Sequence, residues 1–353
     1  MQGNPELTTK RHLELHMIVP GICGPLAETR SLKSSLVIDR WIKTLSKSLC
    51  LPSQGNTNDV LASIFKLKFK ADFPSAALTL MANDMYDPAM FYMHADPVHL
   101  RADMDSAVLN SSADLNISDS ESAALCNMLD QHFNQDDLNF FLLNKDQWFV
   151  SSKDNICMNT TSLIDATGRN INFILPEGKD SARWKQVLTE AQMLMHSHEL
   201  NVSRENSGLM SINSLWLHGS GELTDLKNDE IINLCSDHDL LKGFARHIKC
   251  DHLKVPDSVN EYADYLLSCR HGSVNVLHLT GLEHLVNYTD VIPWLDQQAE
   301  ILEYWIYPLL KFTNKNNIKV TLYPCNEKKY QFSKYDILKF WRKGKLEKHV
   351  NSY

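Results

Sequence analysis

Apolar and polar residues follow one another along this chain with two distinct spacings, and the spacings predict strands and helices in turn. Continuous apolar runs, or apolar and polar residues in alternation, predict strands at 12–19, 91–100, 138–143, 147–151, 212–217, 273–279 and 318–324. Apolar residues three or four positions apart predict helices at 32–49, 60–69, 119–133, 182–195, 240–246, 257–267 and 294–312. The range 73–81 fits either element. The order is therefore βα elements, an α+β middle, and βα elements again.

This order predicts an α/β base domain that is interrupted by a large insertion. The length of 353 residues exceeds that of a usual single core, which also favours two domains. We expect the first part of the base domain at 1–91, an inserted α+β domain at 92–222, and the second part of the base domain at 223–353.

The stretch 182–221 is the most informative part of the insertion. Its helix is followed by a predicted polar turn over 201–208 that carries Arg204, and its strand runs into Gly219-Ser220-Gly221. A helix, an arginine-bearing loop and a strand that ends in glycines can form a wall that binds an anion. The alternative is ordinary α/β packing with a surface arginine.

Composition narrows the classes of function. The formal net charge is −8, which disfavours non-specific binding to nucleic acid. No apolar run reaches membrane-spanning length, and the start of the chain lacks a charged segment followed by a hydrophobic core, so we expect a cytoplasmic protein without membrane contact. The 8 cysteines are scattered without a CxxC pair, so reduced thiols are expected rather than a zinc site or disulfides.

Several short motifs lie in and around the insertion. They are Val98-His99-Leu100-Arg101, His198-Glu199-Leu200-Asn201-Val202-Ser203-Arg204, Gly208, Asn213-Ser214-Leu215-Trp216 and Gly219-Ser220-Gly221. In these motifs, and in the order of elements across most of the chain, the sequence resembles the archaeal-type cofactor-independent phosphoglycerate mutases of the alkaline phosphatase superfamily. Residues 96–103 and 190–194 also resemble a divergent bacterial branch known as RpfE-type regulatory proteins.

The resemblance implies chemistry that this chain departs from. Active mutases of the family use two divalent metals and a serine that carries the phosphoryl group. The family's first strand ends in Asp-Gly, whereas this chain has Pro20-Gly21; a later Asp and His correspond to Glu283 and Asn287. The final strand leads to Thr321-Leu322-Tyr323-Pro324-Cys325-Asn326 instead of an Asp-His pair. Ser34 and Ser35 lie near the place of a nucleophile, but nothing in the sequence marks either one.

We therefore expect an alkaline-phosphatase-like α/β base domain with an inserted α+β domain, without catalytic residues, metal ligands or cofactor. The expected protein is a degenerate, regulatory pseudoenzyme that binds a phosphorylated small molecule or a protein partner. The alternative is an active mutase or phosphatase with altered ligands for Mn²⁺ or Mg²⁺. The residues expected to bind the substrate are Arg101, Arg183, Asn201, Arg204, Asn213 and Ser214, because guanidinium groups match phosphate oxygens.

Each of these residues could instead have a purely structural role. Arg204 can pair with Glu199 or Glu205 on its own loop, and Asn213 and Ser214 can close backbone hydrogen bonds. Three further clusters have metal-ligand chemistry but are also typical of surface loops. They are Asp237-His238-Asp239, Asp251-His252, and Glu283 with His284 and Asp290.

Overall fold

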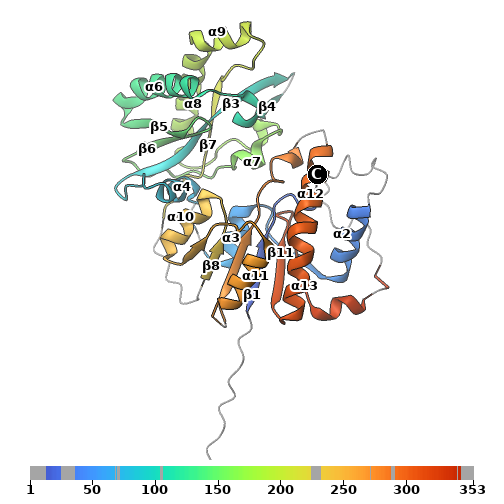
Figure 1. The fold of residues 1–353 in the computed structure, drawn as a ribbon. Helices are drawn as coiled ribbons and strands as arrows, with labels where there is room; N and C mark the ends of the chain where they lie inside the picture. Colours follow the sequence, from blue (N-terminus) through green and yellow to red (C-terminus); the bar gives the residue numbers. More distant parts are fainter. Residues whose placement is uncertain are drawn as a thin grey trace, which may run out of the picture. The chain divides into compact units, whose positions relative to one another are not determined.

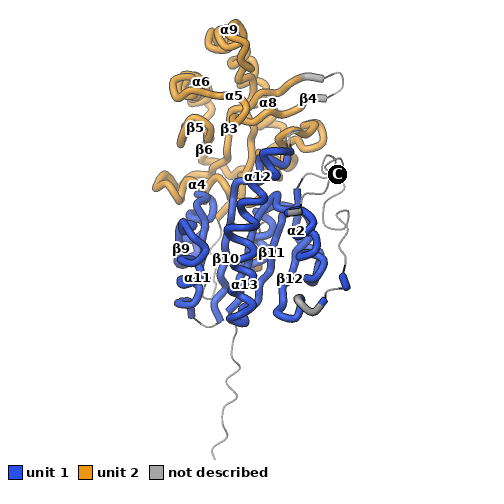
Figure 2. Tube along the Cα trace, turned by 45° about the vertical axis from the view of Figure 1, so that its right-hand side comes forward, with its two compact units in different colours: residues 1–65, 227–353 blue, residues 66–226 orange. Residues whose placement is uncertain are grey.

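A computed structural model describes residues 13–24, 36–67, 69, 72–103, 106–223, 232–270, 272–287, 291–339 and 341–342. Contacts divide the chain into two compact units, each with its own sheet. Unit 1 comprises residues 1–65 and 227–353, and unit 2 comprises residues 66–226 (Figures 1 and 2). Among the described residues, no helix has the length and apolar character needed to cross a bilayer.

Unit 1 is built on a seven-stranded sheet in the order β2-β12-β11-β1-β10-β8-β9. The strands are β1 (Glu14–Ile18), β2 (Leu49–Pro52), β8 (Ile232–Cys235), β9 (Asp251–Leu253), β10 (Val274–His278), β11 (Lys319–Tyr323) and β12 (Lys328–Phe332). Its helices are α2 (Leu36–Lys47), α3 (Thr57–Ile64), α10 (Asp239–Ile248), α11 (Val259–Ser268), α12 (Ile292–Ile301) and α13 (Tyr307–Lys315), with short 3₁₀ turns at Leu285–Asn287 and Lys334–Leu338.

The central strand β1 is parallel to both of its neighbours, β10 and β11. Leu15 and Met17 point into the main hydrophobic core of the unit, which also contains Trp41, Leu277 and Trp294. Strands buried in this way need apolar residues at most positions, and this is why the runs at 12–19, 273–279 and 318–324 predicted them correctly. The antiparallel strands β12 and β2 were not predicted. Strand β12 has only Tyr330 and Phe332 as apolar residues, and the short strand β2 begins at Leu49, where the predicted helix ends.

The long helix predicted at 294–312 is not regular. A π-helical segment, Leu302–Ile306, separates α12 from α13. The following residues include Pro308, which lacks a backbone N–H and whose ring would meet the carbonyl of Tyr304 in a regular α-helix. Widening the turn before the proline removes this conflict, so the helical direction continues without a break.

Unit 2 contains a five-stranded antiparallel sheet in the order β4-β3-β6-β5, with β7 paired to β3. The strands are β3 (Phe91–Asp103), β4 (Ser106–Asn110), β5 (Leu138–Asn144), β6 (Gln147–Ser152) and β7 (Ser214–His218). The helices are α4 (Ser75–Ala82), α5 (Ser112–Leu115), α6 (Asp119–Phe133), α7 (Leu163–Ala166), α8 (Ser181–His196) and α9 (Glu199–Asn206), with 3₁₀ turns at Asn134–Asp136 and Ile171–Phe173. Figure 1 shows α6 and α8 lying side by side over this sheet, and the two helices are in contact.

The start of α6 matches its sequence signal. The Ser118 hydroxyl accepts a bond from the Glu121 N–H, while the Glu121 carboxylate accepts one from the Ser118 N–H. This reciprocal capping satisfies two N–H groups that the helix leaves unpaired.

The polar turn predicted over 201–208 is wrong, because most of it belongs to helix α9. His198 caps this helix by accepting a bond from the Leu200 N–H. The buried face of α9 consists of Asn201 and Arg204 rather than apolar side chains. A hydrophobic spacing rule therefore cannot detect it.

His16 on β1 makes the stability of the chain depend on pH. Its Nδ1 lies 2.9 Å from the Tyr323 hydroxyl, and burial lowers the pKa of the imidazole to about 4. The unfolded value is about 6.5, so the stability due to neutral His16 is present above pH 6.5 and is lost as the pH falls toward 4. Between pH 7 and 4.5, the wild type should lose about 2 to 3 kcal/mol more unfolding free energy than His16→Asn, measured by urea denaturation. Equal losses in the two proteins would contradict this assignment.

Candidate functional site

Arg204 is buried inside unit 2 and its guanidinium is fully engaged. Its Nε donates to the Met210 carbonyl at 2.8 Å, one Nη donates to Glu121 Oε1 at 2.8 Å, and the other donates to the Leu115 carbonyl. Only 2% of the residue is exposed. The ion pair is made with Glu121 of α6, and not with the expected Glu199 or Glu205. Arg204 thus holds α9 against the segment around α5 and α6.

The three uncharged candidates also make internal hydrogen bonds. Asn201 is buried; its amide donates to the carbonyls of Met195 and Ile212 and accepts from the Ile212 N–H. Asn213 bonds both the N–H and the carbonyl of Leu100 on β3, and the Ser214 hydroxyl accepts from Gln192 on α8. These contacts fix the register of β7 against β3 and the position of α8.

The two remaining candidates lie at the surface. Arg101 is exposed on β3, opposite Val108 of β4. Arg183 lies in the first turn of α8, and its guanidinium is 3.5 Å from the Asp154 carboxylate, with 44% of the side chain exposed. An exposed pair at this distance contributes little to stability. Arg101 and Arg183 are therefore the candidate guanidinium groups that solvent and a ligand can reach.

The carboxyl ends of the parallel strands are where α/β sheets usually bind ligands, and in unit 1 the turn after β1 is closed there. Trp294 Nε1 donates to the Gly21 carbonyl at 2.9 Å, and the Gln298 side-chain amide donates to the Ile22 carbonyl at 2.7 Å. A Cβ on Gly21 would lie 2.7 Å from Val286 Cγ2. The turn that has Asp-Gly in the mutases is thus packed against α12 and the Leu282–Val286 region.

The ends of β8 and β10 bring a small polar cluster together on the same unit. His278 Nε2 lies 3.6 Å from Glu283 Oε1, and His278 Nδ1 lies 3.0 Å from the Ser236 hydroxyl. The Thr57 hydroxyl donates to Glu283 at 3.4 Å. Burial pushes the pKa of Glu283 upward, but the bond and charge of His278 and the charge of His238 outweigh it, so the pKa lies below its ordinary value.

A pair of divalent metals is held by several carboxylates and imidazoles around both ions. The described part of this edge presents the largely buried carboxylate of Glu283, the imidazoles of His278 and His238, and the exposed carboxylate of Asp237. Ser34, Ser35 and Asp290, which were also considered from the sequence, lie outside the described residues.

The other clusters singled out in the sequence have structural contacts. The His238 Nδ1 caps α10 by accepting the Leu240 N–H, and Asp237 accepts the Val255 N–H. His252 Nε2 lies 2.9 Å from the Ser236 carbonyl, and His284 is exposed. Within the described part of the chain, the side chains that gather as a group of three metal-type ligands lie elsewhere, in unit 2.

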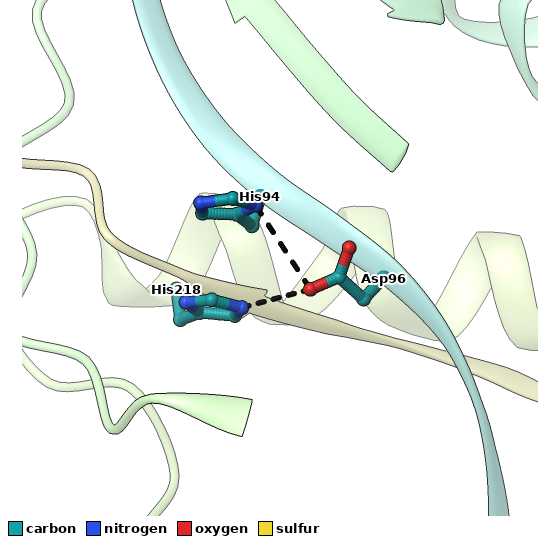
Figure 3. Close-up of side chains that lie close together, drawn as sticks. All are labelled: His94, Asp96 and His218. Atoms are coloured by element: carbon teal, nitrogen blue, oxygen red, sulfur yellow. Dashed lines mark hydrogen bonds and ion pairs between the residues drawn. The ribbon is translucent and has the colours of Figure 1, made fainter. Parts of the chain in front are cut away.

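That group consists of His94, Asp96 and His218, hereafter the HDH cluster (Figure 3). His94 and Asp96 lie two residues apart on β3 and so share one face of the strand, and His218 of β7 is the register partner of His94. His218 Nε2 lies 2.9 Å from Asp96 Oδ2, and His94 Nδ1 lies 3.9 Å from the same oxygen. The two imidazoles are stacked, with centroids 4.4 Å apart.

Burial dominates the electrostatics of the HDH cluster. His94, Asp96 and His218 are 6%, 4% and 8% exposed, so water cannot solvate a charge there. Burial raises the pKa of Asp96 to about 6, although the charge of His94 and a bond from the Trp148 N–H oppose the rise. Burial also lowers the pKa of His218 to about 3.

Sequence reasoning missed the HDH cluster. The His-x-Asp spacing of residues 94 and 96 was a usable signal, since it places both side chains on one face of a predicted strand. The contribution of His218 depends on the pairing of β3 with β7, which are separated by more than 100 residues.

The chain is similar in sequence to 2,3-bisphosphoglycerate-independent phosphoglycerate mutases. The chain has the mixed α/β, alkaline-phosphatase-like fold expected from its sequence. Its sequence is 25% identical over 194 residues to the 2,3-bisphosphoglycerate-independent phosphoglycerate mutase of Methanosarcina barkeri (strain Fusaro / DSM 804), covering 48% of this chain. It is 23% identical over 207 residues to the enzyme of the same name from Methanosarcina acetivorans, covering 52% of this chain. The matches span about half the length of these relatives, 49% and 52%. No family model matches the chain.

Two solved structures are similar over most of the chain. The PH0037 protein from Pyrococcus horikoshii has a TM-score of 0.50 and 14% sequence identity, over 91% of this chain and 87% of its own. A cofactor-independent phosphoglycerate mutase from Thermoplasma acidophilum has a TM-score of 0.41 and 15% identity, over 91% and 90% of the two chains.

The expectation that the chain has no cofactor and no metal is contradicted by this relationship. The relatives are phosphoglycerate mutases of the cofactor-independent kind, for which the resemblance implies Mn²⁺ or Mg²⁺. The HDH cluster adds that the described residues do include a set with metal-ligand chemistry, away from the places that the sequence pointed to.

Proposed function

We propose that this chain is a phosphoglycerate-mutase-like protein that binds a phosphorylated metabolite without transferring its phosphoryl group. The observation that carries the proposal is the closed turn after β1. Gly21 is bonded to Trp294 and packed on Val286 where the active relatives' family has a ligand for one of two metals.

The surroundings of that turn support the loss of transfer chemistry. Cys23 is buried beside this turn, and burial raises the pKa of its thiol to about 12. Glu283 is already engaged by His278 and Thr57. A phosphoryl group in transfer carries charge that a metal pair must neutralise, and this set of groups cannot neutralise it.

Arg101 supports the binding of a phosphorylated compound. An exposed guanidinium presents several N–H donors in a plane that matches phosphate oxygens. Arg101 lies on β3 in the segment that resembles the family's arginine-presenting strand, whereas Arg183 is already close to Asp154.

The experiment compares binding and turnover of 3-phosphoglycerate in the presence of Mn²⁺ and of Mg²⁺. We expect no mutase activity, and a rise in melting temperature with ligand that is reduced in Arg101→Gln and retained in the matched surface variant Arg183→Gln. An absence of stabilisation in the wild type would contradict metabolite binding. Turnover with two bound metals per chain would contradict the loss of transfer chemistry.

A second candidate, a metal-dependent mutase or phosphatase with altered ligands, is favoured by one observation. The Thr57 hydroxyl lies at the start of α3 and bonds to Glu283. A helix N-terminus stabilises negative charge, and a carboxylate can accept a hydroxyl proton. If this candidate is right, Mn²⁺-dependent turnover will be abolished in Thr57→Val.

A further inference from the structure

The HDH cluster in unit 2 has no role in the proposed binding of a metabolite, and its chemistry points to a separate ligand. Its side chains come from two neighbouring antiparallel strands, so their positions are fixed by the backbone pairing of β3 with β7. Gly219, which follows His218, holds this end of β7 tightly: a Cβ there would lie 3.2 Å from His94 Cδ2 and 3.2 Å from the Ala76 nitrogen. Side chains fixed in this way are preorganised for a ligand that needs defined geometry.

The distances within the HDH cluster match the requirements of one small cation. All three residues offer a ligand atom within 4.8 Å of the others. The ligands of a tetrahedral ion with bonds of about 2.1 Å lie about 3.4 Å apart. The separations to Asp96 Oδ2, 2.9 Å from His218 Nε2 and 3.9 Å from His94 Nδ1, lie on either side of that value. Because an imidazole lone pair lies in the plane of its ring, binding one ion would require the two stacked rings to rotate out of their parallel arrangement.

The buried carboxylate of Asp96 also favours a cation in the HDH cluster. Asp96 is 4% exposed, and among the described residues its ionic partners are the two imidazoles, with no Lys or Arg within 4.0 Å. A buried carboxylate needs a positive partner or a proton.

We propose that His94, Asp96 and His218 bind one divalent transition-metal ion, with Zn²⁺ as the ion that best suits two imidazoles and one carboxylate. Three protein ligands leave a fourth coordination position for water or a small anion. The stacked rings each direct one nitrogen toward Asp96, as Figure 3 shows, so the ion would lie between the two strands beside that carboxylate. This site does not rest on the proposed function, because it lies in unit 2 and the closed turn lies in unit 1.

The test is a titration of the chelator-treated full chain with Zn²⁺, and with Co²⁺ as a spectroscopic probe. We expect one equivalent of Zn²⁺, a rise in melting temperature, and visible Co²⁺ absorption typical of a four-coordinate site. His94→Gln, His218→Gln and Asp96→Asn should each weaken Zn²⁺ binding by about a hundredfold or more, since each removes a direct ligand. Asp96→Asn keeps the shape of the side chain, so it tests the ligand even if one histidine variant fails to fold.

His132→Gln is the matched control, because His132 forms a histidine–carboxylate pair with Glu190 in the same unit, at 3.3 Å, but on the surface. This variant should bind Zn²⁺ as the wild type does. Two results would overturn the proposal: a wild type that takes up no Zn²⁺ or Co²⁺, and equal affinity in the wild type, Asp96→Asn and the histidine variants. The first result would leave the HDH cluster as a hydrogen-bonded structural pair, and the second would place the metal elsewhere.

Discussion

Replacing Arg204 with methionine is expected to lower the free energy of unfolding by about 3 to 5 kcal/mol, the cost of leaving a buried pair with one partner. The substitution keeps an unbranched side chain but removes the donors to Met210, Leu115 and Glu121. Both carbonyls would lose a partner in the interior, and the Glu121 carboxylate, 21% exposed, would lose its cation. Urea unfolding measures the loss, and hydrogen exchange should show it first in α9.

Arg183→Met is the control for this prediction. It removes an exposed guanidinium that lies 3.5 Å from Asp154, and should change stability by less than about 0.5 kcal/mol. A stable Arg204→Met protein with weakened phosphoglycerate binding would show instead that Arg204 serves a ligand, as the sequence alone suggested.

Replacing Gly24 with alanine is expected to cost about 3 kcal/mol, because strain and overpacking add at this position. Gly24 has a φ of +73°, and a Cβ there would overlap the six-membered ring of Trp294. Trp294 is 2% exposed and its indole N–H donates to the Gly21 carbonyl, so the side chain cannot move away without breaking the closed turn. Urea unfolding of the full chain measures the cost.

Gly208→Ala separates the two contributions. Gly208 has nearly the same φ, +74°, but a Cβ there would meet nothing within 4 Å, so only the backbone strain of about 1 kcal/mol applies. The double variant Gly24→Ala with Trp294→Phe should be less destabilised than the sum of its single changes, since the shorter ring makes room. Equal costs at Gly24 and Gly208 would mean that Trp294 does not pack on the turn.

The sequence predicts the parts of the fold that rest on apolar burial. The strand at 273–279 and the helix at 182–195 agree with β10 and α8 because both bury a regular hydrophobic pattern. Helix α9 was missed because its buried side chains are polar, and the π-helical segment was missed because it arises from one proline. Strand β12 was missed because it is only 5 residues long and alternates two aromatic side chains with polar ones, a pattern too short to be distinctive.

The candidate site residues were likewise predicted only in part. Sequence reasoning found arginines and amides of the right chemistry, but it could not tell which were engaged inside the protein. Asn201 bonds to a carbonyl 11 residues away and Arg204 to one 89 residues away, and neither contact follows from the residue types alone. The HDH cluster is a site that sequence reasoning did not find. His218 joins it only because β7 pairs with β3, whose Asp96 lies more than 100 residues away in the sequence.

The pairing of β3 with β7 has a consequence for how this protein can change over generations. The polypeptide enters the sheet of unit 2 along β3 and leaves it along the antiparallel neighbour β7, so its way in and its way out lie next to each other. A module threaded like this can be lengthened, trimmed or exchanged between those two strands without rerouting the rest of the molecule. Exchange of the one segment between β3 and β7 would thus be enough to change the ligand specificity of unit 2.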